Sequence, residues 1–229
     1  MKKRGPVYVW CYTVGVAVAF GLVLSFVNQL TAPKIKANRQ AAMCREIMRA
    51  LGYVLRDDAS SEEILARFDA VVAEREYAGA SGGRPLVVWE GYEETDAPGG
   101  GSEPRGKVIG YAFRVGGVGF WGPIEGVLAL EPDLATVRGI SFYKDEETPG
   151  LGHEINAEWF RNAFKGKRVR DAGGAVGVEF TARGKEPKAL NEVDAITGAT
   201  ETTNSVKAFL VRDIGAFLDA AERRGIGKR

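Results

Sequence analysis

The N-terminal stretch constrains this chain more than any other feature. Three basic residues, Lys2, Lys3 and Arg4, are followed by an uncharged run from Gly5 to Pro33. A helix of about 20 apolar residues spans the roughly 30 Å hydrocarbon core of a bilayer, so the run predicts a membrane-spanning helix. The alternative is a cleaved signal peptide, which has a shorter apolar region and a small-x-small cleavage site. The sequence NQLTAPK that ends the run contains no such site, which favours an uncleaved anchor.

Charge does not orient this helix. Three basic residues precede the run, and Lys34, Lys36 and Arg39 follow it. The positive-inside rule compares the basic residues on the two sides of a span. Because both sides are basic, the rule gives no preference here.

The rest of the chain has the composition of a folded domain. Of 229 residues 45% are hydrophobic, and the net charge is +1. No basic tract or stripe indicates a nucleic-acid partner. Cys11 lies in the apolar run and Cys44 beyond it, so we expect no disulfide, and no spacing of cysteine or histidine predicts a metal site. His153 is the only histidine, which makes a hydrolase triad a weak candidate.

Beyond Pro33 the pattern predicts helices at both ends and strands between them. KIKANRQAAMCREIMRAL (34–51) has helical spacing, and a second helix begins at Ser60, where Glu63 completes a capping box before a stripe that reaches Val72. A polar loop rich in Gly and Pro is expected at 94–106. We predict strands at 84–92, 107–115, 124–130, 136–143 and 175–182, a short helix at 157–164 and a final helix at 204–224. This is an α+β pattern: a mixed sheet with flanking helices, preceded by a single N-terminal transmembrane helix.

The stretch DEETPGLGHE (145–154) has two interpretations. As a turn after a strand, it uses Pro149 and Gly150 to reverse the chain and Gly152 to relieve crowding. As a binding loop, it uses the glycines to let the backbone approach a flat ligand, with Leu151 against the ligand face. The stretch alone does not separate the two interpretations.

A cluster of hydroxyl residues, TGATETTNS (197–205), precedes the final helix. Helix capping needs one such residue, and Thr200, Thr202 or Thr203 could serve as the N-cap. The second interpretation uses the free N–H groups and the positive dipole end of the helix, which favour a phosphate. A hydroxyl held there could carry a phosphate ester, and Gly198 and Ala199 leave room for an enzyme or cofactor to reach it.

Two motifs resemble one family. DAITGAT (194–200) matches the flavinylation signature Asp-x-x-Ser/Thr-Gly-Ala-Thr, and ETPGLG (147–152) resembles a second signature of the same proteins. With the N-terminal span and the terminal helix, nearly the whole chain resembles the FMN-binding subunits of ion-pumping redox complexes: the G subunit of Rnf and the C subunit of Nqr. Residues 119–167 are more similar to the Nqr subunit, whereas the compact length and LTAPKIKANRQ are more similar to the Rnf subunit.

The resemblance assigns roles to the hydroxyl cluster. It implies that Thr200 carries FMN as a phosphoester, attached by a flavin transferase. Asp194, Thr197, Gly198 and Ala199 would belong to the sequence that the transferase recognises. The family often has Ser at the position of Thr197, and the exchange keeps the hydroxyl.

The resemblance also implies a set of residues around the isoalloxazine ring. Trp121, in the GFWG turn, is a further candidate wall, with a core aromatic as the alternative. His153 stands at a position where Gly is common in the Nqr subunit, and we interpret it as an exposed loop residue. The residues implied to line the ring are Glu147, Thr148, Gly150, Leu151 and Gly152.

The function implied is that of an electron carrier within a larger complex rather than a stand-alone enzyme. FMN would do the redox chemistry, and no side-chain acid or base would be required. The implied partners are the other subunits of an Rnf or Nqr-type membrane complex, the flavin transferase and the lipid bilayer, with the soluble domain outside the cytoplasmic membrane. The expected division is a cytoplasmic tip and transmembrane helix at 1–33, a helical connector at 34–80 and an FMN-binding domain at 81–229.

Two alternatives stay open at this point. One is a membrane-anchored extracytoplasmic binding or assembly module without flavin, in which TGAT is only a helix cap. The other is a flavinylated carrier that serves a different extracellular electron-transfer pathway.

Overall fold

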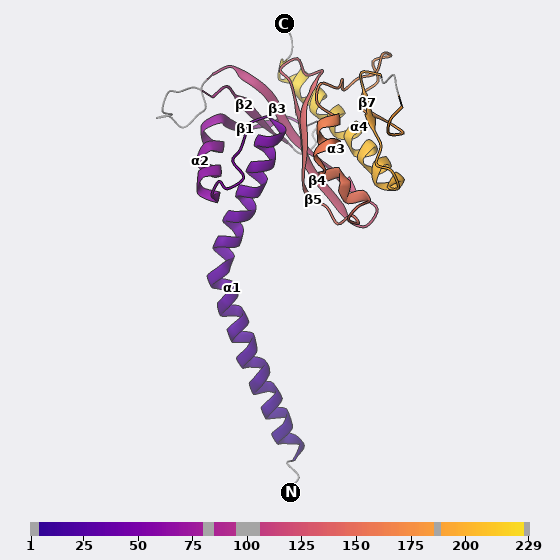
Figure 1. The fold of residues 1–229 in the computed structure, drawn as a ribbon. Helices are drawn as coiled ribbons and strands as arrows, with labels where there is room; N and C mark the ends of the chain where they lie inside the picture. Colours follow the sequence, from indigo (N-terminus) through magenta and orange to yellow (C-terminus); the bar gives the residue numbers. More distant parts are fainter. Residues whose placement is uncertain (1–4, 80–84, 95–105, 186–188, 227–229) are drawn as a thin grey trace. The chain divides into compact units, whose positions relative to one another are not determined.

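A computed structural model describes residues 5–79, 85–94, 106–185 and 189–226. The polar loop predicted at 94–106 lies almost wholly outside these ranges. The chain divides into two compact units, Met1–Ala41 and Ala42–Arg229. Figure 1 shows the elements of both units, coloured along the sequence.

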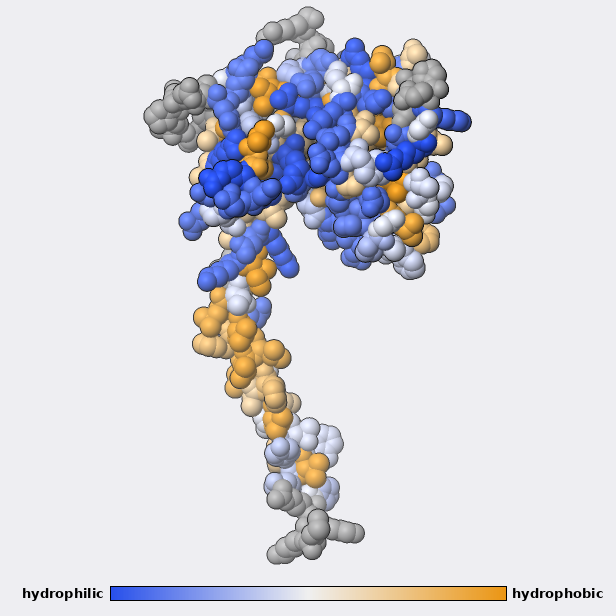
Figure 2. Space-filling view, viewed as in Figure 1, coloured by the Kyte–Doolittle hydropathy of each residue, from blue (hydrophilic) through white to orange (hydrophobic). Residues whose placement is uncertain are grey.

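The first unit consists of most of a long helix, α1 (Pro6–Ala50). Its segment Pro6–Ala32 has 27 residues and a mean hydropathy of 2.0, and its most apolar part is not buried. The segment is therefore long and apolar enough to cross a membrane. In Figure 2 hydrophobic residues cover much of this segment, with paler residues near its N-terminal end. The sequence predicted separate helices on the two sides of Pro33, but α1 runs through that position. A proline inside a helix removes one backbone N–H donor, which does not always end the helix.

The second unit is built on a five-stranded sheet in the order β1-β2-β3-β4-β5. Every neighbouring pair is antiparallel, so the strands form a simple meander. The strands are β1 (Val72–Tyr77), β2 (Leu86–Tyr92), β3 (Val108–Val118), β4 (Pro123–Leu130) and β5 (Val137–Lys144). The sequence predicted one mixed sheet. In the structure the parallel strand pair forms a separate two-stranded sheet, made of β6 (Glu179–Thr181) and β7 (Glu192–Asp194). The predicted α+β class is confirmed.

The helix α2 (Ser61–Val71) forms as predicted from its capping box. The Ser60 side chain accepts a hydrogen bond from the Glu63 N–H, and the Glu63 carboxylate accepts one from the Ser60 N–H. The predicted apolar stripe extends one residue too far, because Val72 is already the first residue of β1.

The expected connector at 34–80 is divided differently in the structure. Residues 72–77 pair with β2 along their whole length, so they belong to the sheet rather than to a helical link. Strand β7 was also not predicted. The predicted strand at 175–182 shrinks to the three residues of β6.

Two helices cover the sheet near the site, α3 (Glu158–Ala163) and α4 (Thr200–Arg223). Figure 1 shows both helices in the second unit. α4 begins four residues before the predicted start, and its apolar face packs on β3. Buried side chains of the sheet and of α4, including Phe113, Leu128, Phe209 and Phe217, form one core. This packing fixes the first turn of α4 against the end of the sheet.

Candidate functional site

A cavity of about 340 Å³ lies where three segments meet: the β3–β4 turn, the loop after β5 and the first turn of α4. Its volume is within the range of small-molecule sites. The cavity is lined by Phe120, Trp121, Glu147, Thr148, Leu151, Gly152, Gly198, Ala199, Thr200, Glu201 and Thr202. The structure therefore brings together both stretches that the sequence singled out.

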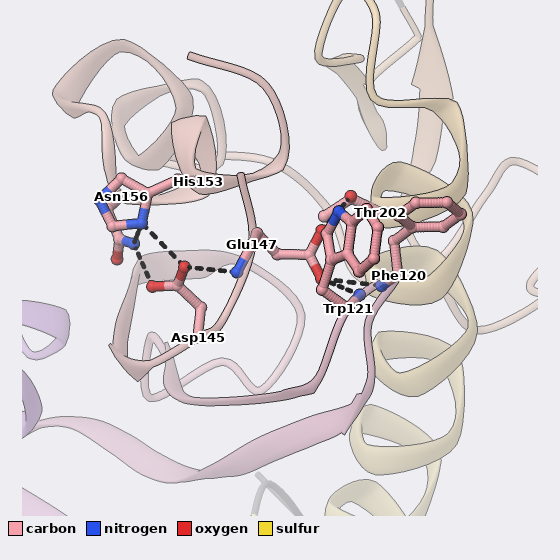
Figure 3. Close-up of polar contacts among 7 residues, drawn as sticks. All are labelled: Phe120, Trp121, Asp145, Glu147, His153, Asn156 and Thr202. Atoms are coloured by element: carbon pink, nitrogen blue, oxygen red, sulfur yellow. Dashed lines mark hydrogen bonds and ion pairs between the residues drawn. The ribbon is translucent and has the colours of Figure 1, made fainter. Parts of the chain in front are cut away.

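Glu147 connects the three segments. Its Oε1 atom accepts hydrogen bonds from the backbone N–H of Phe120 at 2.7 Å and of Trp121 at 3.1 Å. Its Oε2 atom accepts a 2.6 Å hydrogen bond from the Thr202 hydroxyl. Figure 3 shows the carboxylate between the turn and the helix. The residue is only 6% exposed, so these three donors replace its water shell.

Two glycines enclose this carboxylate. A Cβ atom at Gly119 would overlap Glu147 Oε1, and one at Gly152 would overlap both Glu147 Oε2 and the Thr202 hydroxyl. The role predicted for Gly152, relief of crowding, therefore has a definite cause. Because Gly152 has no side chain, the Glu147 carboxylate and the Thr202 hydroxyl can lie there and form their hydrogen bond.

The walls of the cavity are apolar and open to solvent. Trp121 is 66% exposed and Phe120 is 58% exposed, and their rings meet edge to face with centroids 5.1 Å apart. Leu151 is 43% exposed and lies close to Gly198. Trp121 is thus not a core aromatic. Phe120 was missed by the sequence reasoning, although its place beside Trp121 in the same hairpin turn could have indicated it.

The hydroxyl cluster does not act as a helix cap. The N-cap residue of α4 is Ala199, which makes no side-chain capping bond, so the expectation that Thr200, Thr202 or Thr203 caps the helix is wrong. Thr203 is buried and donates to the Ala199 carbonyl, while Thr202 donates to Glu147. The Thr200 side chain is exposed and lines the cavity. Within the described part of the chain its hydroxyl has no hydrogen-bond partner.

Three predicted site residues lie outside the lining. Asp194, in β7, accepts a hydrogen bond from the Gly184 N–H at 3.3 Å. Thr197 is exposed beside the cavity rather than in it. Gly150 has a φ of 76°, a conformation that favours glycine, so it shapes the turn.

His153 belongs to a polar cluster with Asp145 and Asn156, which Figure 3 shows beside Glu147. Asp145 accepts hydrogen bonds from the Asn156 amide at 2.7 Å and from the Glu147 N–H at 3.2 Å. His153 Nδ1 lies 2.8 Å from the same carboxylate. His153 is exposed, as predicted, and the cluster holds the backbone that positions Glu147.

The charges of the lining are negative. It contains Glu147 and Glu201 and no Lys, Arg or His. The positive contribution comes from the N-terminus of α4, whose first N–H groups and dipole favour an anion. No group of three or more potential metal ligands occurs among the described residues.

Comparison with known proteins finds a family match over the part of the chain that forms the cavity. Residues 119–212 match the FMN-binding domain family. The C subunit of the Na(+)-translocating NADH-quinone reductase of Chlamydia pneumoniae is 38% identical over an alignment of 121 residues that covers 46% of this chain and 38% of that protein. Its counterpart from Pseudomonas aeruginosa is 38% identical over an alignment of 111 residues that covers 47% of this chain and 42% of that protein. The chain therefore matches only about two fifths of the length of these relatives.

Solved structures have the same fold. The crystal structure of the C subunit of the Na(+)-translocating NADH-quinone reductase from Parabacteroides distasonis has a TM-score of 0.63 at 24% identity, covering 80% of this chain and 92% of that one. The crystal structure of Shewanella oneidensis NqrC has a TM-score of 0.64 at 20% identity, covering 78% and 92%. Residues 119–212 of this chain therefore match the FMN-binding domain family, and the chain is similar to C subunits of Na(+)-translocating NADH-quinone reductases.

Proposed function

We propose that this chain is a membrane-anchored subunit that carries FMN covalently on Thr200 and relays electrons within an Nqr-type complex. The observation that carries the proposal is the position of Thr200. Its hydroxyl is exposed, has no hydrogen-bond partner among the described residues and lines the cavity at the first position of α4. The flavin transferase is the implied modifying enzyme, since the residues around Thr200 match its signature.

The neighbouring hydroxyls are poorer candidates for the ester. Thr202 and Thr203 are buried and engaged in hydrogen bonds. Thr197 is exposed but stands outside the cavity lining. Of the four threonines from 197 to 203, only Thr200 combines exposure, a free hydroxyl and a place in the cavity.

The lining offers FMN an apolar surface and the N-terminus of α4. Trp121, Phe120 and Leu151 offer apolar surface to a flat ring and exclude water from it. Because the lining has no basic side chain, it holds no ion-pair partner for a free phosphate, and the first N–H groups of α4 would be the donors available to it. A covalent ester to Thr200 would retain the cofactor where ion pairing does not. FMN, when bound, supplies the electron-transfer chemistry.

The anchor and the orientation complete the proposal. The segment Pro6–Ala32 would hold the subunit in the cytoplasmic membrane, with the second unit on the extracytoplasmic side. The partners would be the other subunits of a Na+-translocating NADH-quinone reductase, since the relatives are C subunits of that enzyme. In spheroplasts, added protease should digest the domain beyond residue 50, and its protection would contradict the orientation.

Intact-protein mass tests the covalent link. Full-length protein coexpressed with an active flavin transferase should gain the mass of one FMN phosphoester. Thr200→Ala should fold normally, because this hydroxyl makes no bond in the described protein, and should lose the adduct completely. Thr197→Ala is the comparison variant: it removes another exposed hydroxyl of the same motif and should retain some adduct, because its oxygen carries no ester. An unmodified wild-type chain, or an adduct that persists in Thr200→Ala, would refute the assignment.

A further inference from the structure

We propose that Glu147 is a positioning residue that ties the aromatic wall of the cavity to the helix bearing Thr200, and that its buried charge opposes reduction of the group in the cavity. This inference rests on the proposed function for the identity of that group. It assigns Glu147 a role in holding and tuning the site in addition to lining it.

The hydrogen bonds support the positioning role. Glu147 accepts hydrogen bonds from the backbone N–H groups of Phe120 and Trp121, whose aromatic rings form a wall of the cavity. The third donor is Thr202, in the first turn of α4 and two residues after Thr200. A ligand bound to Thr200 and stacked on Trp121 would contact both α4 and the β3–β4 turn. Within the described site, only the Glu147 carboxylate forms hydrogen bonds to both of these segments. A loss of Glu147 would therefore uncouple the wall from the attachment point.

The surroundings of the carboxylate support the electrostatic role. Glu147 is buried, and no Lys, Arg or His in the described chain forms an ion pair with it. Its charge is stabilised by three hydrogen bonds rather than cancelled by a cation. Coulomb energy depends inversely on the effective dielectric constant, which is about 20 near buried sites and about 80 in water. Negative charge added to a group in this cavity therefore meets a poorly screened carboxylate.

Two substitutions separate the roles. Glu147→Gln keeps the shape: the carboxamide oxygen can accept the two N–H bonds, and its NH₂ group can donate to the Thr202 hydroxyl. Only the charge is lost. Glu147→Ala removes the hydrogen bonds as well. Glu146→Gln is the matched control, because Glu146 is the adjacent carboxylate and is exposed to solvent.

The first measurement uses the full-length protein without flavin, purified in detergent. Amide hydrogen exchange at Phe120 and Trp121 should be slow in the wild type and in Glu147→Gln. It should speed up about tenfold or more in Glu147→Ala, because charge-assisted acceptors are lost. Thr202→Val should accelerate exchange less, and Thr202→Ser should restore it. Unchanged exchange in a folded Glu147→Ala would overturn the positioning role.

The second measurement uses the flavin-loaded protein. Glu147→Gln should raise the reduction potential of the bound flavin by more than Glu146→Gln does, because the buried carboxylate is screened less than the exposed one. Equal or absent shifts would overturn the electrostatic role. If the wild type gains no FMN mass, the proposed function fails and the electrostatic role with it, while the exchange measurement still decides whether Glu147 holds the turn. If Glu147→Ala does not fold, exchange in Thr202→Val and Thr202→Ser decides the positioning role, and Glu147→Gln decides the role of the charge.

Discussion

The rings of Phe113 in β3 and Phe217 in α4 stack face to face, with centroids 4.2 Å apart and planes 7° apart. Both side chains are fully buried. Tyr77 in β1 stacks on the same Phe217 ring at 6.4 Å. Since α4 carries Thr200 at its first position, this aromatic contact helps to fix the proposed attachment residue relative to the sheet and its β3–β4 turn.

Phe217→Ala should therefore be strongly destabilising. Removing a buried phenylalanine costs about 3–5 kcal/mol through lost burial and the cavity left behind. The measurement is urea unfolding of the full-length protein in detergent, followed by circular dichroism. The control is Phe120→Ala, which removes the same side chain from an exposed position and should change the free energy of unfolding by less than about 1 kcal/mol. Similar losses in both variants would contradict the packing described for α4.

Local signals in the sequence predicted the elements that depend on few residues. The capping box places Ser60 and Glu63 three positions apart, so its pattern is visible without knowledge of the fold. Strand β1 was missed because VAEREY has three charged residues, and it becomes a strand only by pairing with β2. Its burial comes from the sheet and from α4 rather than from its own pattern.

The candidate site divides in the same way. The motifs around Thr200 and Leu151 were visible as sequence signatures, and the structure places both in one cavity. The bonds of Glu147 were not predictable, since they join residues 27, 26 and 55 positions apart. No periodicity links such positions. A contact of that range is set by how β3, β4 and α4 pack.

Cys44 should be protected from alkylation in the native protein. Burial, with a smaller contribution from the nearby Asp69 and Glu74 carboxylates, raises the pKa of its thiol to about 11. The thiolate is the reactive form, so iodoacetamide at pH 8 should label Cys44 much more slowly in native protein than in urea. Peptide mass spectrometry distinguishes it from Cys11. A native labelling rate equal to the unfolded rate would contradict the buried position.

The same pKa makes a prediction about stability. The unfolded thiol ionises near 9.0 and the folded thiol has a pKa of about 11, so the unfolded chain loses its proton first. The contribution of Cys44 to stability is fully present below pH 9 and declines as the pH rises toward 11. Cys44→Ala should flatten the alkaline decline in unfolding free energy. The measurement is urea unfolding at a series of alkaline pH values, and parallel declines in the two proteins would contradict the assignment.

Leu151→Asp should lower the reduction potential of the loaded protein. The Leu151 side chain lines the cavity and stays 43% exposed, so aspartate can be accommodated there without entering the core. A carboxylate beside the ring repels the negative charge of the reduced cofactor. The covalent link should persist, because Thr200 is unchanged. Redox titration with spectroscopic detection is the measurement, and Leu151→Asn, of similar size without charge, is the control. Equal potentials in the two variants would contradict the position of Leu151 beside the bound flavin ring.

Gly152 and Gly150 form a matched pair for the last prediction. Gly150 has a φ of 76°, and a Cβ atom there would meet nothing within 4 Å. Gly150→Ala should therefore cost about 1 kcal/mol of backbone strain and leave the cavity intact. Gly152 does not have a positive φ, so its φ does not require glycine, but its Cβ position is occupied by the Glu147 carboxylate and the Thr202 hydroxyl.

Gly152→Ala should push these two groups apart. The Glu147 carboxylate would then lose its Thr202 donor in a buried setting, which costs about 1–3 kcal/mol in addition to the steric strain. We expect the larger fall in unfolding free energy for Gly152→Ala. We also expect the coexpressed transferase to attach less FMN, because Glu147 no longer holds the turn with Phe120 and Trp121 against α4. Unfolding in urea and intact mass give the two readouts. If Gly150→Ala proved the more damaging of the two, the turn conformation rather than the enclosure of Glu147 would be what these glycines protect.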